Sequence, residues 1–417
     1  IAKKELSLVN ESMQGHFSGI GVSFRIIEDT ICIMSVIDNG PSMKKGILAG
    51  DKIIKVNNQL FVGDFLSNDT VMKTLKGNTG SEVFLNIKRP KQDSLLSFKI
   101  KRGYVEMSSI DAAFNINSKY SYIKMNRFSS NSYEEFIKVI NNLKITEKQT
   151  LILDLRSNPG GVLGDCYEIA EEFFSKGDLI FYTENRNNNS RKFKSRKNGT
   201  LRNNNIFVLV DENSASASEI IAGAIQDNDR GVIMGKRTFG KGLVQEQFEL
   251  KNGSAVRLTT QKYFTPSGRL IQKPYKGFSL EQEKILNKIA SGEILNLDSI
   301  SFLDSVKFTT KKGRIVYGGG GIFPDVFVYD DTSNIDDFER GEIYLEILNY
   351  HMQNYILNYF ELEKIASQYD INTFASDFDL NKKEILELEK HYNKRAKQNT
   401  YIVFNEQEKK VIKKYIK

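Results

Sequence analysis

The chain has 417 residues, of which 40% are hydrophobic and 11% aromatic, so it can build two or three hydrophobic cores and is not disordered throughout. Its net charge is +7, but the basic residues are spread among 52 acidic ones, which argues against nucleic acid as a partner. No apolar run reaches the roughly 18 residues that a membrane-spanning helix needs.

The start of the chain and its cysteines set simple expectations. The first residue is Ile1, with no methionine and no signal-peptide pattern, so we expect a mature or trimmed form. Cys32 and Cys166 fall in different predicted domains, so we expect two buried thiols and no disulfide. Neither the cysteines nor the three histidines stand in a metal-binding motif, and we expect neither a metal nor a cofactor.

The N-terminal quarter has the pattern of a small β-rich domain. Residues 1–14 are expected to be the end of a helix or a linker, and the domain itself to span residues 15–103. A short helix is expected near residues 69–75. The predicted strands alternate apolar and polar residues between glycine-containing turns; they are GIGVSF, TICIMSVI, DKIIKVNN, SEVFLNIKR and LLSFKIKRG.

Residues 104–332 alternate strand and helix patterns. Such alternation, with continuously apolar strands, predicts an α/β core in which helices cover a layered sheet. The Asn-rich basic stretch at residues 186–197 is expected to be a mobile loop, and residues 333–417 a helical C-terminal extension. The buried strands are TLILDLR and NIFVLVDE, and the helices are SYEEFIKVINNLK, DCYEIAEEFFSKG and ASEIIAGAIQD.

A run of small residues, ENSASASE, joins the predicted strand NIFVLVDE to the helix that follows it. A serine at such a turn exposes its hydroxyl beside the unsatisfied N–H groups of the first helical turn, which suits a nucleophile next to an oxyanion hole. The segment alone favours a simpler interpretation, in which Ser214, Ser216 or Ser218 only caps the helix.

Lys241 stands between two glycines in the segment RTFGKGLVQ. A lysine can take a proton from a serine only while its amine is neutral, and a dry site favours that form. Phe239, Leu243 and Val244 are expected to line such a site. Taken alone, the segment favours an exposed lysine in a turn.

The segment TLILDLRSNPGGVLGD runs from a buried strand into Asn-Pro-Gly-Gly. This loop can present free N–H groups at the end of the sheet, where α/β proteins bind ligands, or it can be an ordinary turn into the next helix.

Together the blocks resemble the C-terminal processing peptidases, tail-specific enzymes with a Ser–Lys catalytic pair. The resemblance implies Ser216 as the nucleophile, Lys241 as the general base and Gln245 as the residue that orients Lys241. The blocks follow one another in the family's order; they are LILDLRSNPGGVL, ENSASASEIIAGAIQDNDRGVIMGKRTFGKGLVQ, QKYFTPSGRLIQ and YGGGGIFPDV.

The same resemblance implies an oxyanion hole built from backbone N–H groups. One donor would be Ala217, directly after the nucleophile, and the other would come from the pair Gly160 and Gly161. Which of the two glycines supplies it stays open.

Residues 15–103 resemble a PDZ domain placed ahead of the peptidase core, through FSGIGVSF and PSMKKGILAGDKIIKVN. Such domains add a C-terminal tail to a sheet edge and bind its carboxylate with backbone N–H groups. The resemblance implies Gly19, Ile20 and Gly21 as these donors, and Arg89 as a residue that signals to the active site. The alternative is a small β-domain with a purely structural role.

We therefore expect a serine endopeptidase that cleaves exported proteins near their C-termini through an acyl-enzyme, in the bacterial periplasm or cell envelope. Its partners would be protein or peptide substrates bound by their tails, and a membrane-associated adaptor and a homo-oligomer are both compatible with this expectation. Two alternatives stand beside it: a catalytically silent PDZ scaffold or binding protein, and a relative that binds retinoids or processes free peptides.

Overall fold

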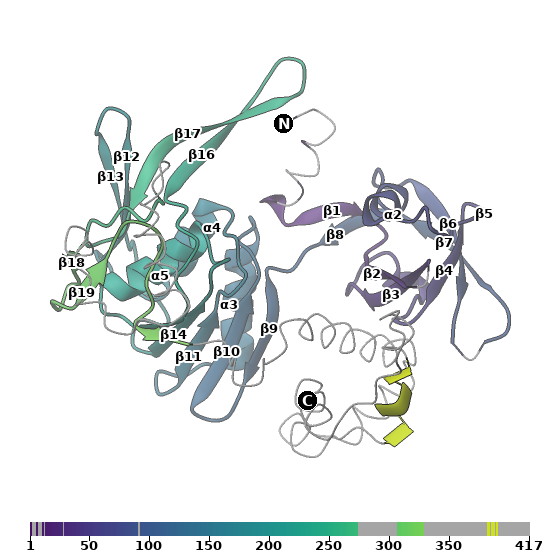
Figure 1. The fold of residues 1–417 in the computed structure, drawn as a ribbon, viewed down its shortest axis with the longest axis horizontal. Helices are drawn as coiled ribbons and strands as arrows, with labels where there is room; N and C mark the ends of the chain where they lie inside the picture. Colours follow the sequence, from purple (N-terminus) through teal and green to yellow (C-terminus); the bar gives the residue numbers. More distant parts are fainter. Residues whose placement is uncertain are drawn as a thin grey trace, which may run out of the picture. The chain divides into compact units, whose positions relative to one another are not determined.

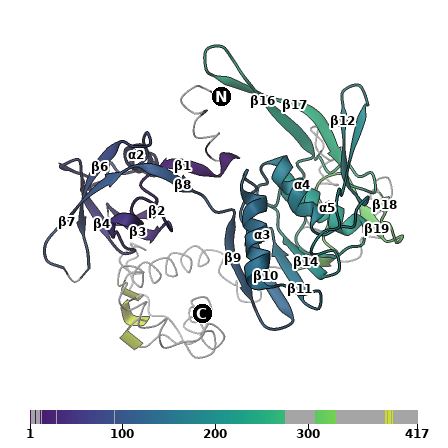
Figure 2. The same cartoon turned by 180° about the vertical axis from the view of Figure 1, so that it is seen from behind.

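The computed structural model describes residues 13–273 except 28 and 91, residues 307–328, and isolated positions towards both ends (Figures 1 and 2). The chain divides into two compact units, one joining Ile1–His16 to Met107–Asp330 and one built around Phe17–Glu106. In the described part of the chain no helix is long and apolar enough to cross a membrane. Most of the predicted extension at 333–417 and most of residues 1–14 lie outside the described residues.

The Phe17–Glu106 unit is an antiparallel sheet with one packed helix. The strand order is β2-β3-β4-β6-β7, which leaves one long edge of β2 without a partner strand in the described sheet. Helix α2, Asn68–Leu75, begins where the Ser67 side chain accepts a hydrogen bond from the Thr70 N–H. The sheet strands are β2 (Val22–Ile27), β3 (Thr30–Val36), β4 (Lys52–Val56), β6 (Glu82–Lys88) and β7 (Leu96–Lys101), with β5 (Gln59–Leu60) beside β4.

The core of this unit follows the alternation seen in the sequence. Val71 and Leu75 of α2 pack on the buried face of the sheet with Ile31, Ile53 and Leu85. A separate two-stranded pair is formed by β1 (His16–Gly19) and β8 (Gly103–Glu106), which the sequence did not predict.

The second unit contains a six-stranded sheet in the order β20-β15-β14-β11-β10-β9. All neighbours pair in parallel except β9, which is antiparallel to β10. Parallel strands bring the loops after their carboxyl ends to one edge of the sheet. The strands are β9 (Ile110–Asn115), β10 (Tyr120–Met125), β11 (Thr150–Asp154), β14 (Asn205–Val210), β15 (Val232–Gly235) and β20 (Val326–Phe327).

Helices and a second sheet complete this unit. Buried residues of α3 (Ser132–Leu143), α4 (Leu163–Glu171) and α5 (Ala217–Asp227) share one core with the six-stranded sheet and with Tyr263. The predicted α/β core with layered helices is therefore confirmed, and the PDZ-like domain precedes it. The second sheet has the order β13-β12-β17-β16, and its strands are β12 (Leu179–Asn185), β13 (Ser190–Lys194), β16 (Leu243–Glu249) and β17 (Ala255–Phe264).

The stretch 186–197 was predicted to be a mobile loop, and this was wrong. It forms the turn of the β12–β13 hairpin and then strand β13 (Figure 1). The Arg196 guanidinium donates to the buried Glu171 carboxylate at 2.6 Å, and Lys197 binds the buried Glu172. Arg196 and Lys197 are fixed because the two buried carboxylates need cationic partners. Cys32 and Cys166 are buried and free, as predicted.

Candidate active site

The three serines in and next to the turn between β14 and α5 differ in their hydrogen bonds and burial. The Ser214 hydroxyl donates to the Leu155 carbonyl at 2.8 Å, and the Ser218 hydroxyl donates to the Asn158 carbonyl at 2.9 Å. Both serines are fully buried. Ser216 is the N-cap of α5 and has φ 55° and ψ −110°, which is an uncommon backbone conformation for a residue with a Cβ. Of the three, Ser216 is the one whose side chain lines a pocket.

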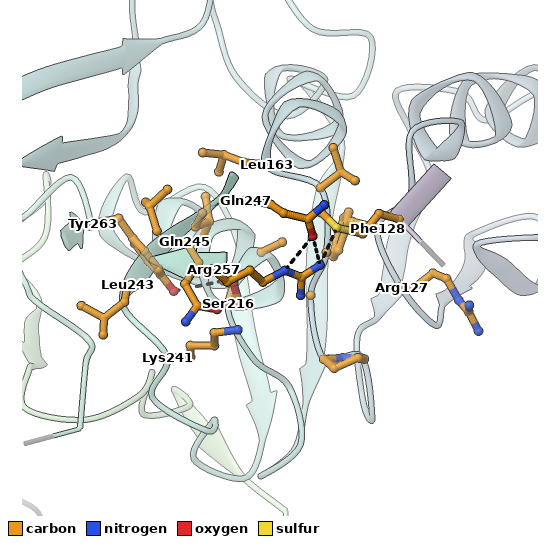
Figure 3. A pocket seen from close by; sticks show the side chains of 18 of the residues that line it. Arg127, Phe128, Leu163, Ser216, Lys241, Leu243, Gln245, Gln247, Arg257 and Tyr263 are labelled. Atoms are coloured by element: carbon orange, nitrogen blue, oxygen red, sulfur yellow. Dashed lines mark hydrogen bonds between the residues drawn. The ribbon is translucent and has the colours of Figure 1, made fainter. Parts of the chain in front are cut away.

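This pocket has a volume of about 760 Å³ and lies at the carboxyl edge of the parallel sheet (Figure 3). Lys241 reaches it from the loop before β16, and Gln245 from β16 itself. The peptidase-site residues that the sequence indicated therefore all line one pocket; they are Ser216, Lys241, Gln245, Ala217, Gly160 and Gly161.

Apolar side chains form much of the pocket wall. Leu243 and Val244 line it as expected, but Phe239 does not: its side chain is 53% exposed elsewhere on the loop. The expectation for Phe239 was wrong because Glu219 binds Thr238 and Gly240 on either side of it, while Phe239 itself is exposed to solvent. The other apolar lining residues include Phe128, Val162, Leu163, Ile220 and Tyr263.

Glu219 connects the serine turn to the lysine loop. Its Oε2 accepts hydrogen bonds from the Ser216 N–H at 2.8 Å and the Lys241 N–H at 2.9 Å. Its Oε1 accepts from the Thr238 hydroxyl at 2.6 Å and the Gly240 N–H at 2.7 Å. The side chain is fully buried, and this burial raises the pKa of Glu219 against the effect of its four donors. One carboxylate thus fixes the backbone of both segments.

Asn158 connects the Asn-Pro-Gly-Gly loop to the serine turn through hydrogen bonds. Its side-chain amide donates to the Met125 carbonyl at 3.0 Å and accepts from the Gly160 N–H at 2.9 Å. Its own carbonyl accepts from the Ala215 N–H at 3.0 Å. The sequence analysis missed Asn158 and Glu219, although both stand inside the quoted blocks. The available signal was that each is a polar residue in a turn predicted to be buried.

Gly160 allows the two turns to approach closely. It has φ 95°, and a Cβ at this position would lie 2.9 Å from the Ala217 nitrogen and 2.9 Å from the Ser216 Cβ. A side chain here would displace the serine turn. The Tyr263 hydroxyl donates to the Ser216 carbonyl at 3.0 Å and also fixes that turn.

The backbone N–H groups facing this turn are not equivalent. The Gly160 N–H is occupied by Asn158. Those of Ala217 and Gly161 donate to none of the residues that the structure describes. Ala217 and Gly161 are therefore the pair with free N–H groups beside Ser216.

Gly19, Ile20 and Gly21 lie in the Phe17–Glu106 unit, at the end of β1 and in the turn that leads into β2. The carbonyls of Ile20 and Gly21 accept from the N–H groups of Ser42 and Ile37, which fixes the turn. The Arg89 guanidinium makes a two-point ion pair with the buried Asp51, at 2.7 and 2.8 Å, and also donates to the Gly46 carbonyl. Arg89 therefore has an internal partner in its own unit.

Two family models match this chain. Residues 119–278 match the model of peptidase family S41, and residues 18–101 match that of the PDZ domain. The chain therefore carries a PDZ domain followed by a peptidase domain. The part of the chain at residues 119–278 is similar to peptidase family S41, and the chain is similar to the carboxy-terminal processing proteases that the sequence resembled.

Curated relatives agree with this assignment. The carboxy-terminal-processing protease of Bartonella bacilliformis is 33% identical over 63% of this chain and 61% of that protein. The carboxy-terminal processing protease CtpB of Bacillus subtilis is 33% identical over 65% of this chain and 56% of that protein. The chain thus spans less than two thirds of the length of either relative. The solved photosystem II D1 C-terminal processing protease is 23% identical, covering 80% of this chain and 78% of that one, with a TM-score of 0.40.

Proposed function

We propose that this chain is a serine endopeptidase in which Ser216 is the nucleophile and Lys241 the general base. The observation that carries the proposal is the different environment of three neighbouring serines. The hydroxyls of Ser214 and Ser218 donate hydrogen bonds to buried carbonyls, whereas Ser216 lines the pocket that Lys241 also lines.

The reaction would proceed as acyl transfer. The Ser216 oxygen attacks the peptide carbonyl while its proton passes to the Lys241 amine. The oxyanion accepts hydrogen bonds from the N–H groups of Ala217 and Gly161. Collapse of the tetrahedral intermediate breaks the peptide bond, and the leaving amine takes the proton from Lys241. Water then attacks the acyl-enzyme and gives a proton to Lys241; the ester bond to Ser216 breaks, the Ser216 oxygen takes that proton, and the new carboxyl end of the peptide leaves.

Gln245 and Glu219 would act as positioning residues. Gln245 stands on β16 four residues after Lys241 and lines the same pocket, which suits a hydrogen bond to the lysine amine when substrate is bound. Glu219 would hold the Ser216 and Lys241 backbones in register, since its carboxylate accepts hydrogen bonds from both N–H groups. The proposed reaction uses only side-chain and backbone groups and needs no metal or cofactor.

We propose that the module at 15–103 binds substrate tails and delivers them to the core at 104–332. The free edge of β2 suits an extended peptide as an added strand, and the turn at Gly19, Ile20 and Gly21 would bind the terminal carboxylate with its N–H groups. Exported proteins of the bacterial cell envelope are the proposed substrates. Neither an adaptor nor self-association is required for this mode of binding.

The decisive experiment compares two serine variants on a protein substrate with an apolar C-terminus. Ser216→Ala should abolish cleavage and keep a native circular dichroism spectrum, since its hydroxyl contributes little to packing. Ser218→Ala should remain active at reduced stability, since it loses one buried hydrogen bond of about 1 kcal/mol. Near-normal cleavage by Ser216→Ala would refute the assignment, and tail binding without cleavage in the wild type would identify a PDZ scaffold instead.

A further inference from the structure

The pocket around Ser216 carries an excess of basic side chains. Its lining residues include Arg127, Lys241 and Arg257, and no carboxylate is among them. Glu219, the nearest buried acid, directs its oxygens at the Ser216 turn and the lysine loop. The proposed chemistry uses Lys241 and leaves both arginines without a role.

Arg257 has only weak, neutral partners. Its Nε and Nη2 both donate to the Gln247 side-chain oxygen at 3.2 Å, and Nη2 lies 3.1 Å from the Met13 sulfur. Within the described ranges no carboxylate pairs with it, whereas Arg89, Arg156 and Arg196 each bind one at 2.6–2.7 Å. A guanidinium presents five donors in a planar fork that fits a carboxylate in two-point contact. Arg257 therefore keeps capacity for an acidic ligand.

The strand register places Arg257 along the path from the reacting groups. Gln245 pairs with Thr259 and Gln247 with Arg257 on adjacent strands β16 and β17. Alternate residues of a strand share a face, so Gln245, Gln247 and Arg257 face the pocket together. Two residues along a strand span about 6.7 Å, which is also the span of two residues in an extended substrate. A substrate that runs along this strand past Ser216 would therefore place a residue only a few positions from the scissile bond beside Arg257.

Arg127 is a weaker candidate for the same ligand. Its Nε donates to Asn126 at 2.9 Å, and in Figure 3 its side chain points away from Ser216, while Arg257 lies beside Gln247 and on the Ser216 side. Arg257 therefore combines a position facing the pocket with a guanidinium that Gln247 contacts without neutralising it.

We propose that Arg257, presented by Gln247, is a specificity-determining residue that binds a peptide carboxylate close to the scissile bond. The inference rests on the proposed peptidase function and names a substrate class for it: peptides with an acidic group next to the apolar residues that fit the rest of the pocket. The carboxylate can come from an Asp or Glu side chain or from the free C-terminus of a short tail. Both sources offer the same chemistry to the guanidinium.

The test uses internally quenched peptides in matched pairs. One series replaces Glu by Gln at each of three positions on either side of the cleaved bond, and the other compares free and amidated C-termini. Wild-type protein should prefer one acidic member by about tenfold in kcat/KM, the loss expected for one exposed charge-assisted pair. Arg257→Gln should abolish that preference and cleave the neutral peptide within about twofold of the wild-type rate.

Two further variants sharpen the result. Arg191→Gln is the matched control, since Arg191 lies on β13 outside the pocket with its guanidinium over the Phe193 ring, and it should keep the preference. Arg257→Glu should invert the preference towards a peptide with Lys at the same position. A wild type that ignores the charge in both series, or an Arg257→Gln variant whose preference equals that of the wild type in both series, would overturn the inference.

A binding measurement separates this inference from the peptidase proposal. The same peptide pairs are titrated by fluorescence anisotropy into Ser216→Ala protein with and without Arg257→Gln. A tenfold affinity difference that disappears with Arg257→Gln supports the subsite even if no peptide is cleaved. Because the tail-binding module is identical in both proteins, its own carboxylate preference cancels in the comparison.

Discussion

The two sheets of the peptidase unit contribute to the pocket in different ways. The parallel sheet supplies turns whose backbones are fixed by buried polar side chains, Asn158 and Glu219. The β16–β17 hairpin supplies side chains on an exposed ribbon, where Gln245 and Arg257 are open to solvent. In the proposed mechanism the buried network positions the reacting groups, whereas Arg257 on the ribbon selects the peptides that bind beside them. Substitutions in the buried network should therefore affect the rate on every substrate, and substitution of Arg257 should affect preference.

The largest effect is expected at Lys241. Lys241→Arg should lower kcat by about a thousandfold, nearly as much as Lys241→Ala, because a guanidinium stays charged and cannot accept the proton of Ser216. Lys262→Arg on the neighbouring strand β17, outside the pocket lining, is the matched control and should be unaffected. Initial rates on a small peptide measure this; substantial activity in Lys241→Arg would show that the lysine acts only through its charge.

Gly160 should give the next largest effect. Gly160→Ala should lower kcat roughly a hundredfold on all substrates, because the new Cβ would push the Ser216 turn away from the oxyanion donors. Gly164→Ala, four residues on, has no atom within 4 Å of its added Cβ and should keep full activity. Equal activities of the two variants would mean that the close approach at Gly160 has no role in catalysis.

Much of this geometry could be predicted from the sequence, because it is local. The segment ENSASASE predicted the passage from β14 through a turn of small residues into α5, and the strands and helices around it follow apolar periodicity. The sequence of this segment alone could not predict which of its serines faces the pocket. That depends on the carbonyls of Leu155 and Asn158, roughly sixty positions earlier in the chain. The β16–β17 hairpin also escaped prediction, because its exposed ribbon carries no clean apolar alternation.

Glu219 tests whether the buried network acts through geometry. Glu219→Gln replaces one acceptor oxygen by an amide group that faces N–H donors, so kcat should fall by about tenfold to a hundredfold and stability by about 1–3 kcal/mol. Glu134→Gln, at an exposed position of α3, is the control and should change neither. Chemical denaturation and peptide kinetics provide the two readouts.

The same residue predicts a pH dependence. Because burial raises the pKa of Glu219, the wild type should lose activity on acidification at a higher pH than an ordinary glutamate near 4.3 would cause. Stability should change in the opposite sense: the folded state binds the proton more tightly, so the unfolding free energy falls as pH rises through this window. Glu219→Gln should show neither dependence. A persisting acid limb in that variant would assign it to another group.

The smallest effect is expected from the substrate's tail. A protein substrate with a free apolar C-terminus should be cleaved about tenfold faster than the same protein amidated at its end, because amidation removes the charge that the N–H groups of Gly19, Ile20 and Gly21 would bind. The difference should survive in Arg257→Gln, which leaves the Phe17–Glu106 unit intact. Equal rates across several apolar tails would mean that this PDZ domain does not bind the carboxylate.

The most direct measurement is covalent labelling of the intact protein by a fluorophosphonate, followed by peptide mapping. The reagent reacts with a serine only where a base and an oxyanion hole activate it. We predict a single adduct on Ser216, which disappears in Ser216→Ala and in Lys241→Ala and persists in Arg257→Gln. An adduct on Ser214 or Ser218, or undiminished labelling in Lys241→Ala, would contradict the Ser216–Lys241 assignment.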